Sequence, residues 1–205
     1  MPTHLRGIFA LLIVTLAWGT TFPAMKDLTS YFTPVWIIFM RFFLAAMMLA
    51  PFLRGIRWQD LRIGLLMGAL LFVCFIFQVE GLTLTSSNRN AFITGLNVLI
   101  VPLLGIALGN WPEKRIIFAV FLAILGLFAL CWDGGGWSRG DNLTLVCAVA
   151  YAIYIKMMEV YSRRVASLMS FTAAQITGVF LSALAWLLIS EVPSAPVEMR
   201  IDMAN

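Results

Sequence analysis

Seven long apolar stretches dominate this chain of 205 residues. A helix needs about 20 mostly apolar residues to cross the hydrocarbon core of a bilayer, and each stretch approaches that length. Lipid offers the backbone no hydrogen bonds, so such stretches fold as helices that satisfy their own peptide groups. The chain is therefore predicted to be an all-α membrane protein, a multipass bundle of about seven transmembrane helices. The predicted spans are Gly7–Met25, Thr33–Leu53, Ile63–Val79, Ala91–Leu108, Ile116–Trp132, Leu143–Met158 and Ala166–Ile189.

The overall composition excludes a water-soluble domain. Hydrophobic residues make up 61% of the chain and charged residues 12%, whereas soluble domains carry roughly 45–50% and about 25%. The single histidine, His4, has no neighbouring ligands, and the spans contain no set of nucleophile, histidine and acid. We therefore expect no metal, no cofactor, no nucleic-acid partner and no enzymatic activity. The cysteines form no Cys-x-x-Cys pair and are predicted to be buried apolar side chains; they are Cys74, Cys131 and Cys147.

Positive charge is distributed unequally between the alternate loops. The loops on the amino-terminal side of the predicted bundle hold eight Lys and Arg residues, and the loops on the other side hold four. Because short cytoplasmic loops carry the excess of Lys and Arg, the amino terminus is predicted to be cytoplasmic, in a plasma (inner) membrane protein. The eight are Arg6, Arg54, Arg57, Arg62, Lys114, Arg115, Arg163 and Arg164, and the four are Lys26, Arg89, Arg139 and Arg200.

A weak internal repeat relates the first and sixth spans. The sequence Ala-Trp-Gly at 17–19 has an echo 133 residues later, in Ala-Tyr-Ala at 150–152. With a gap of one residue, Arg41 of the second span falls opposite Gln175 of the seventh. An odd number of crossings separates the two copies, so the second is inverted in the bilayer. Inverted repeats are a common construction of secondary transporters, whose substrate sites lie at the repeat interface.

Three segments resemble the EamA-type drug/metabolite transporter superfamily: Ala-Trp-Gly-Thr-Thr-Phe-Pro at 17–23, Arg-Phe-Phe-Leu-Ala-Ala at 41–46, and Leu-Thr-Ser-Ser at 84–87. The resemblance implies ten spans in two five-helix repeats that carry small metabolites such as amino acids, amines and drug-like solutes. It assigns residues 7–132 to the first repeat and residues 143–189 to two helices of the second. A polar tail, 190–205, stands where the family has three further helices.

Arg41 is the most informative residue in the predicted spans. An Arg at the centre of a bilayer costs about 2.5–3.5 kcal/mol on insertion scales, so its side chain is expected to face protein or a cavity and to have a partner. Two interpretations stay open at this point. The guanidinium either meets a substrate carboxylate or the backbone of a broken helix, or it is a folding anchor or snorkelling side chain.

The first span contains a candidate partner for this guanidinium. Pro23 cannot donate a hydrogen bond to the carbonyl of Gly19, and the rise of about 1.5 Å per residue places Gly19 and Arg41 at similar depths. We therefore predict a helix break at Gly19 and Pro23, with Arg41 capping the opened turn. This turn would form one wall of a substrate cavity.

Further polar and aromatic residues in the spans are candidates for the same cavity. Intramembrane polar groups need partners and often mark a transport pathway. Glu80 and Gln78 close the third span and are candidates for a gate or a coupling site, although a solvated end-group is the simpler interpretation of Glu80. The cavity candidates besides Arg41 are Trp18, Thr20, Thr21, Asn97, Tyr151, Tyr154 and Gln175.

Two functions are compatible with this pattern. The first is a secondary transporter of small organic metabolites that works by alternating access, with a small solute and the lipid bilayer as its partners. The alternative is a truncated or non-transporting bundle that acts only as an assembly partner. A homodimer could supply the absent helices from a second copy.

Overall fold

The computed structural model describes residues 3–107, 114–131 and 136–190, and the regular structure of this part is entirely helical. Six of its helical stretches are long and apolar enough to cross a membrane. The prediction of an all-α multipass membrane protein is therefore confirmed. In chain order the elements are α1 (Thr3–Leu28), α2 (Pro34–Leu49), the 3₁₀ turn η1 (Ala50–Leu53), α3 (Trp58–Leu84), α4 (Ser87–Gly95), α5 (Asn97–Ala107), α6 (Lys114–Cys131), α7 (Arg139–Ser162) and α8 (Leu168–Ser190).

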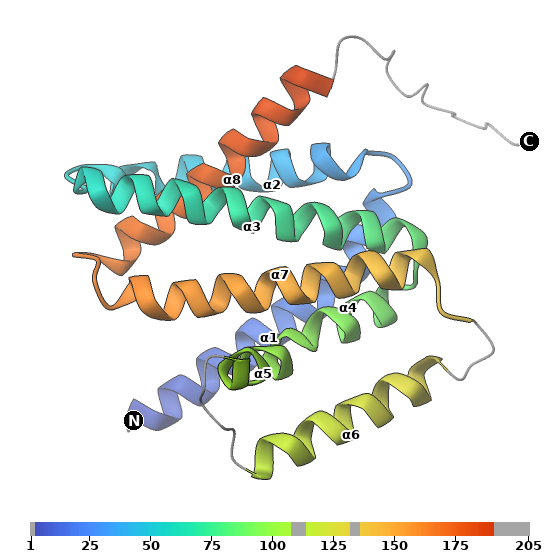
Figure 1. The fold of residues 1–205 in the computed structure, drawn as a ribbon. Helices are drawn as coiled ribbons and strands as arrows, with labels where there is room; N and C mark the ends of the chain where they lie inside the picture. The colour runs from blue at the N-terminus through green and yellow to red at the C-terminus, as the bar shows by residue number, and fades with distance from the viewer. Residues whose placement is uncertain (1–2, 108–113, 132–135, 191–205) are drawn as a thin grey trace, which may run out of the picture.

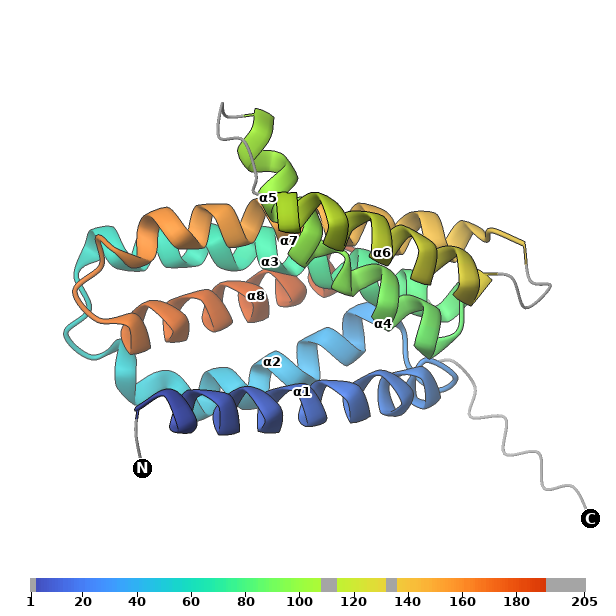
Figure 2. The same cartoon turned by 90° about the horizontal axis from the view of Figure 1, so that it is seen from below.

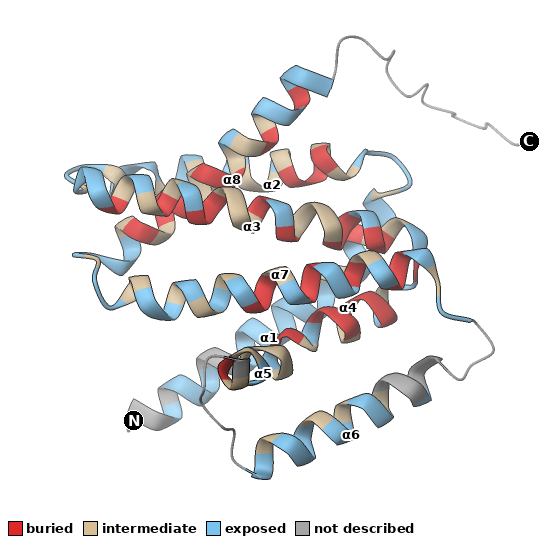
Figure 3. Cartoon of the chain, viewed as in Figure 1, coloured by how far each residue is buried: buried red, intermediate tan, exposed pale blue. Residues whose placement is uncertain are grey.

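Helix α3 is the centre of the bundle. It packs along both α7 and α8, and α8 packs in turn against α2 (Figure 1). The buried residues gather on these helices and on α4, whereas α1 and α6 are mostly exposed (Figure 3). Helix α6 lies at the expected span Ile116–Trp132 but is not one of the six membrane-length stretches found in the described residues, and Trp132 lies outside those residues. Cys74 and Cys147 are free, buried thiols, as predicted.

Small residues allow α3 and α8 to pack closely. A Cβ atom at Gly68 would lie 2.2 Å from the carbonyl oxygen of Gln175 and 2.7 Å from the Cα of Gly178, and a Cβ at Gly64 would lie 2.5 Å from that of Ala174. Helices in lipid associate through such small-residue contacts because they have no hydrophobic driving force between them. The Gly64-x-x-x-Gly68 pattern is therefore a helix-packing motif. By contrast, a Cβ at Gly105 of α5 would meet nothing within 4 Å among the described residues, so this glycine is not required by a close helix contact there.

The fourth span is two helices rather than one. Helix α4 ends at Gly95 and α5 begins at Asn97, and α5 leaves the direction shared by most of the other helices (Figure 2). The predicted span Ala91–Leu108 is present as Ser87–Ile106, but the prediction of one unbroken helix there is wrong. The amide of Leu96 donates to the carbonyl of Ile93 at 3.1 Å, and Asn97 Nδ2 donates to the carbonyl of Thr94 at 2.8 Å. These bonds end α4, because an Asn side chain competes with the backbone for the carbonyls of the preceding turn.

Helix α1 is continuous through Pro23, so the predicted break at Gly19 and Pro23 is also wrong. A proline inside a helix removes one hydrogen bond, but here the remaining bonds hold the helical path from Thr3 to Leu28. The hydroxyl of Thr21 donates to the carbonyl of Ala17 at 2.7 Å, within the same helix. The broken helix of this bundle is the fourth span, not the first.

Lys26 closes the carboxyl end of α3. Its Nζ donates to the carbonyls of Leu82 at 2.6 Å, Thr83 at 3.1 Å and Thr85 at 3.0 Å. The last carbonyls of a helix have no partner within the helix, and a cation there also interacts favourably with the helix dipole. Lys26, which was expected to be a loop cation, therefore ties α1 to α3.

We expect Lys26→Met to destabilise the protein by about 1–2 kcal/mol, because three carbonyls lose a charged donor. Hydrogen exchange at the end of α3 measures the effect, which should be faster exchange in the variant. Lys156→Met is the matched control, since the one partner of Lys156 among the described residues is Glu159, on the same helix. Equal exchange rates at the end of α3 in Lys26→Met and the unmodified protein would contradict this role.

Candidate functional site

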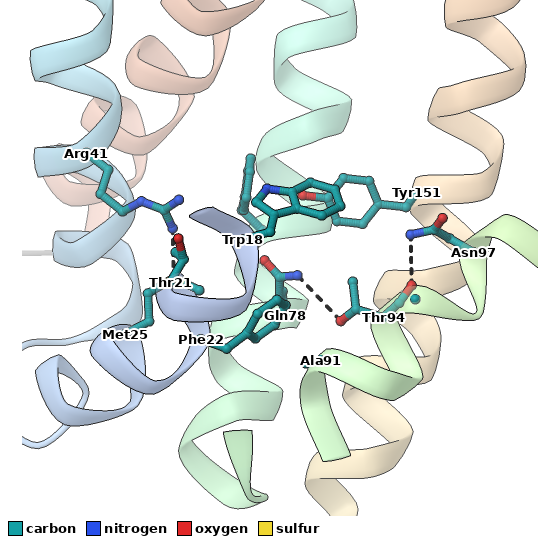
Figure 4. A pocket seen from close by; sticks show the side chains of 12 residues that line it. Trp18, Thr21, Phe22, Met25, Arg41, Gln78, Ala91, Thr94, Asn97 and Tyr151 are labelled. Carbon is teal, nitrogen blue, oxygen red and sulfur yellow. Dashed lines mark hydrogen bonds between the residues drawn. The ribbon is translucent and has the colours of Figure 1, made fainter. Parts of the chain in front are cut away.

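A cavity of about 80 Å³ lies among α1, α2, α3, α7 and the break between α4 and α5 (Figure 4). It sits part-way along the spans, between helices that are far apart in the sequence. One charged side chain and several aromatic, amide and hydroxyl groups line it. The lining residues are Trp18, Thr21, Phe22, Met25, Arg41, Phe75, Gln78, Ala91, Thr94, Gly95, Asn97 and Tyr151.

Arg41 is half-buried at the edge of this cavity. Its Nη1 donates to the sulfur of Met25 at 2.7 Å, and its guanidinium carbon lies 5.7 Å from the ring centre of Phe75 and 6.0 Å from that of Phe42. These contacts replace the predicted cap on the carbonyl of Gly19. Within the described residues no carboxylate forms an ion pair with Arg41.

The broken fourth span supplies the polar wall of the cavity. Gln78 of α3 donates from Nε2 to the hydroxyl of Thr94 at 3.4 Å, and Asn97 donates to the carbonyl of the same residue. Gly95 and Ala91 complete this wall with little side-chain volume. The turn at Leu96 thus brings an amide, a hydroxyl and the backbone to one side of the cavity.

Aromatic side chains form much of the remaining wall. The rings of Phe75 and Tyr151 meet edge to face with their centres 5.9 Å apart. Phe22 and Trp18 approach from α1, and Trp18 is 61% exposed. The cavity is therefore apolar over most of its surface, with a few convergent polar groups, as small-molecule sites generally are.

The structure brings together five of the predicted cavity residues and one predicted gate residue. Trp18, Thr21, Arg41, Asn97 and Tyr151 line the cavity, as does Gln78. Sequence reasoning missed the aromatic Phe22 and Phe75, together with Met25. Phe22 and Met25 follow Trp18 at helical spacing, a pattern that could have indicated them. The other missed residues are Ala91, Thr94 and Gly95.

Four other candidates lie away from the cavity. Thr20 donates to backbone carbonyls within α1, and Glu80 is exposed. Tyr154 donates through its hydroxyl to Oε1 of Gln175, and Nε2 of Gln175 donates to the sulfur of Met158 at 3.5 Å. Met158 follows Met25 by 133 residues, the offset of the internal echo. In each of the two hairpins, α1–α2 and α7–α8, a polar side chain of the second helix thus donates to a methionine sulfur of the first.

A buried polar cluster, here called the Asp141 network, joins α3, α4 and α7 beside the cavity residue Gln78. Asp141 is completely buried. Its carboxylate accepts from Arg89 Nη2 at 2.7 Å, from the hydroxyl of Thr85 at 2.7 Å and from the amide of Ser138 at 2.8 Å. Beside it, Asn90 Nδ2 donates to the hydroxyl of Thr144 at 2.8 Å and to the carbonyl of Gln78 at 3.0 Å. The network consists of Thr85, Arg89, Asn90, Ser138, Asp141 and Thr144.

The Asp141 network changes the interpretation of Arg89, which was counted as a loop cation. Its side chain is 11% exposed and its partner carboxylate is fully buried. Two features of the sequence place the pair at helix starts. Ser86 caps α4 by accepting from the amide of Arg89, and Ser138 and Asp141 form a capping box at α7. The Ser-x-x-Asp spacing at 138–141 could have indicated the cap, but not its pairing with Arg89.

Comparison with known proteins finds a transporter family and two relatives named as transporters. The EamA-like transporter family matches residues 5–132. An "Uncharacterized transporter" of Archaeoglobus fulgidus is 34% identical over 161 residues, which cover 78% of this chain and 51% of that protein. The "Uncharacterized transporter YyaM" of Bacillus subtilis is 26% identical over 212 positions, which cover 96% of this chain and 68% of that protein.

The chain spans about half the length of the archaeal relative. No solved structure matches it significantly. The family match covers more than half of the chain and includes the cavity residues of α1 to α5. This chain therefore belongs to the EamA-like transporter family, within the drug/metabolite transporter superfamily.

Proposed function

We propose that the protein is a secondary transporter of small organic solutes that works by alternating access in the plasma (inner) membrane, with a cytoplasmic amino terminus. The observation that carries the proposal is a cavity part-way along the spans, with the buried Asp141 network bonded to its lining residue Gln78 through Asn90. A cavity with a few polar groups beside an interrupted helix is a common form of substrate site in such transporters.

The arrangement of the two hairpins supports this mechanism. We assign α1–α2 and α7–α8 as inverted counterparts, because the methionine contacts of Arg41 and Gln175 recur at equivalent positions. Trp18 and Tyr151 are equivalent by the same offset, and both line the cavity. The solute would then bind between two related walls, as expected for a site at a repeat interface.

Solute accumulation tests the transport proposal directly. Cells that produce the chain are compared with cells that produce Arg41→Ala, at equal abundance in the membrane, for a panel of labelled amino acids, amines and carboxylates. We expect at least one solute to differ in accumulation between the two. Equal accumulation of every solute would support the alternative of a non-transporting bundle.

Accessibility of the cavity tests alternating access. A thiol placed by Ala91→Cys, in a chain carrying Cys131→Ala, is expected to react with a membrane-impermeant maleimide from the face opposite the Asp141 network. Adding Asp141→Asn should give labelling from the network face, because the carboxylate that joins α3, α4 and α7 loses its charge. Tyr31→Cys and Arg62→Cys, at exposed sites toward opposite faces, report the sidedness of the vesicles.

The parent chain without the Ala91 substitution provides the blank for this labelling. Reaction from both faces at once, or no response to Asp141→Asn, would contradict alternating access through this cavity.

A further inference from the structure

The cavity carries a net positive charge. Arg41 is the one charged residue among its twelve lining residues, and none of them is an acid. The other polar groups are the amides of Gln78 and Asn97 and the hydroxyls of Thr21, Thr94 and Tyr151. Amides and hydroxyls can orient a solute without neutralising a cation. An arriving solute therefore meets a guanidinium that no acid of the described residues neutralises.

The present partners of Arg41 leave most of its binding capacity unused. A guanidinium has five N–H donors in a planar fork that matches the two oxygens of a carboxylate. Here the described contacts are the thioether of Met25 and the faces of Phe42 and Phe75. A thioether is a weak acceptor, and aromatic faces attract a cation without accepting its N–H groups in a fork.

The second hairpin, α7–α8, has a neutral residue at the position equivalent to Arg41. Gln175, the counterpart of Arg41, is neutral and nearly fully buried, and it bonds both Tyr154 and Met158. It does not line the cavity. The two related walls thus differ by one positive charge, and only the wall with Arg41 presents its polar group to the cavity. This asymmetry favours a solute with a single anionic group.

The size and walls of the cavity define the rest of the ligand. A volume of about 80 Å³ is several times the roughly 10–15 Å³ that one water molecule needs on the same measure, and it is enough for a carboxylate head group. Figure 4 shows Arg41 and Asn97 on opposite sides of the cavity, with Trp18 and Tyr151 between them. Trp18 is largely exposed and provides an aromatic surface along which the body of the solute can extend.

We infer that the cavity binds organic monocarboxylates with an aromatic or apolar body, with Arg41 as the docking point for the carboxylate. This inference deepens the proposed transport function and rests on it. The carboxylate would replace the sulfur of Met25 as the acceptor from Nη1. The apolar body would lie against Trp18, Phe75 and Tyr151. An amine of the same shape would be repelled by the guanidinium.

Three probes of matched shape test the inference on the purified full chain in non-ionic detergent: phenylacetate, phenylacetamide and phenethylamine. Binding is followed by tryptophan fluorescence and checked by calorimetry. We expect phenylacetate to bind at least ten times more tightly than either of the other probes. Similar affinities for all three, or no binding of phenylacetate, would overturn the inference.

Variants assign the selectivity to Arg41. Arg41→Gln, which copies the second hairpin, should reduce phenylacetate binding at least tenfold, to the level of the amide. Arg41→Lys keeps the charge without the fork and should give an intermediate affinity. Arg62→Gln removes an exposed positive charge elsewhere and should change nothing. Unchanged phenylacetate binding in Arg41→Gln would overturn the inference, and a melting curve establishes that each variant is folded.

The outcomes separate this inference from the proposed function. Selective binding of phenylacetate without movement of any solute in cells would contradict transport and leave the anion site standing. Accumulation that depends on Arg41 but is indifferent to solute charge would support transport and contradict the anion site.

Discussion

Asp141→Asn is expected to destabilise the protein by about 3–5 kcal/mol, the usual cost of removing one partner of a buried ion pair. The carboxylate is fully buried, and it accepts hydrogen bonds from Arg89, Thr85 and the amide of Ser138. An amide side chain replaces one acceptor oxygen with a donor and leaves the charge of Arg89 without compensation. Unfolding by sodium dodecyl sulfate in mixed micelles measures the free energy of unfolding of the variant and of the unmodified protein.

Glu159→Gln is the matched control for this change. Like Asp141, Glu159 forms ion pairs, here with Lys156 and Arg163, but its side chain is 51% exposed. Exposed pairs contribute about 0–1 kcal/mol, so the control should be close to neutral. The double variant Arg89→Gln with Asp141→Asn should cost less than the sum of the two single changes, because neither buried charge then lacks its partner. A neutral effect of Asp141→Asn would contradict the assignment of a buried network.

Gly68→Leu is expected to disrupt the packing of α3 against α8, at a cost of about 3 kcal/mol or more, the upper end for overpacked cores. A Cβ at this position would lie 2.2 Å from the carbonyl oxygen of Gln175. The obstacle is backbone rather than a flexible side chain, so the helices themselves must separate. Thermal unfolding in detergent, followed by size-exclusion chromatography, measures the loss of stability.

Gly7→Leu is the control for Gly68→Leu, because Gly7 of α1 is exposed and a Cβ there meets nothing within 4 Å. Removing a helical glycine there should be neutral or stabilising, by about 0.5–1 kcal/mol for the helix itself. Equal melting temperatures for the two variants would show that α3 and α8 are not in close contact through Gly68.

The lengths and hydropathy of the spans were sufficient to predict the helical bundle. The signal is strong because lipid forces each apolar stretch to satisfy its own backbone. The break at Leu96 was not predicted, since Gly95 and Asn97 are each tolerated inside a helix and only the side-chain bond of Asn97 to Thr94 distinguishes this site. Conversely, Pro23 is a strong breaker in sequence, yet α1 continues through it.

The candidate site was predicted in part. Arg41 and Asn97 were found because polar groups inside apolar runs are costly and therefore informative. The pairing of Arg89 with Asp141 joins residues 52 positions apart, and each stands beside a predicted loop, where a charged residue is ordinary. Such a pair is visible only after the helices have been placed in space.

The break at Leu96 has a further consequence for the interior of this protein. The end of α4 and the start of α5 leave peptide groups without intrahelical partners, near the middle of the Ser87–Ile106 span. Hydrocarbon cannot satisfy these groups, and irregular backbone at such depth is tolerated only inside protein or beside water. The break at Leu96 must therefore face the protein and the cavity that Gly95 and Asn97 border, and point away from the acyl chains of the lipid.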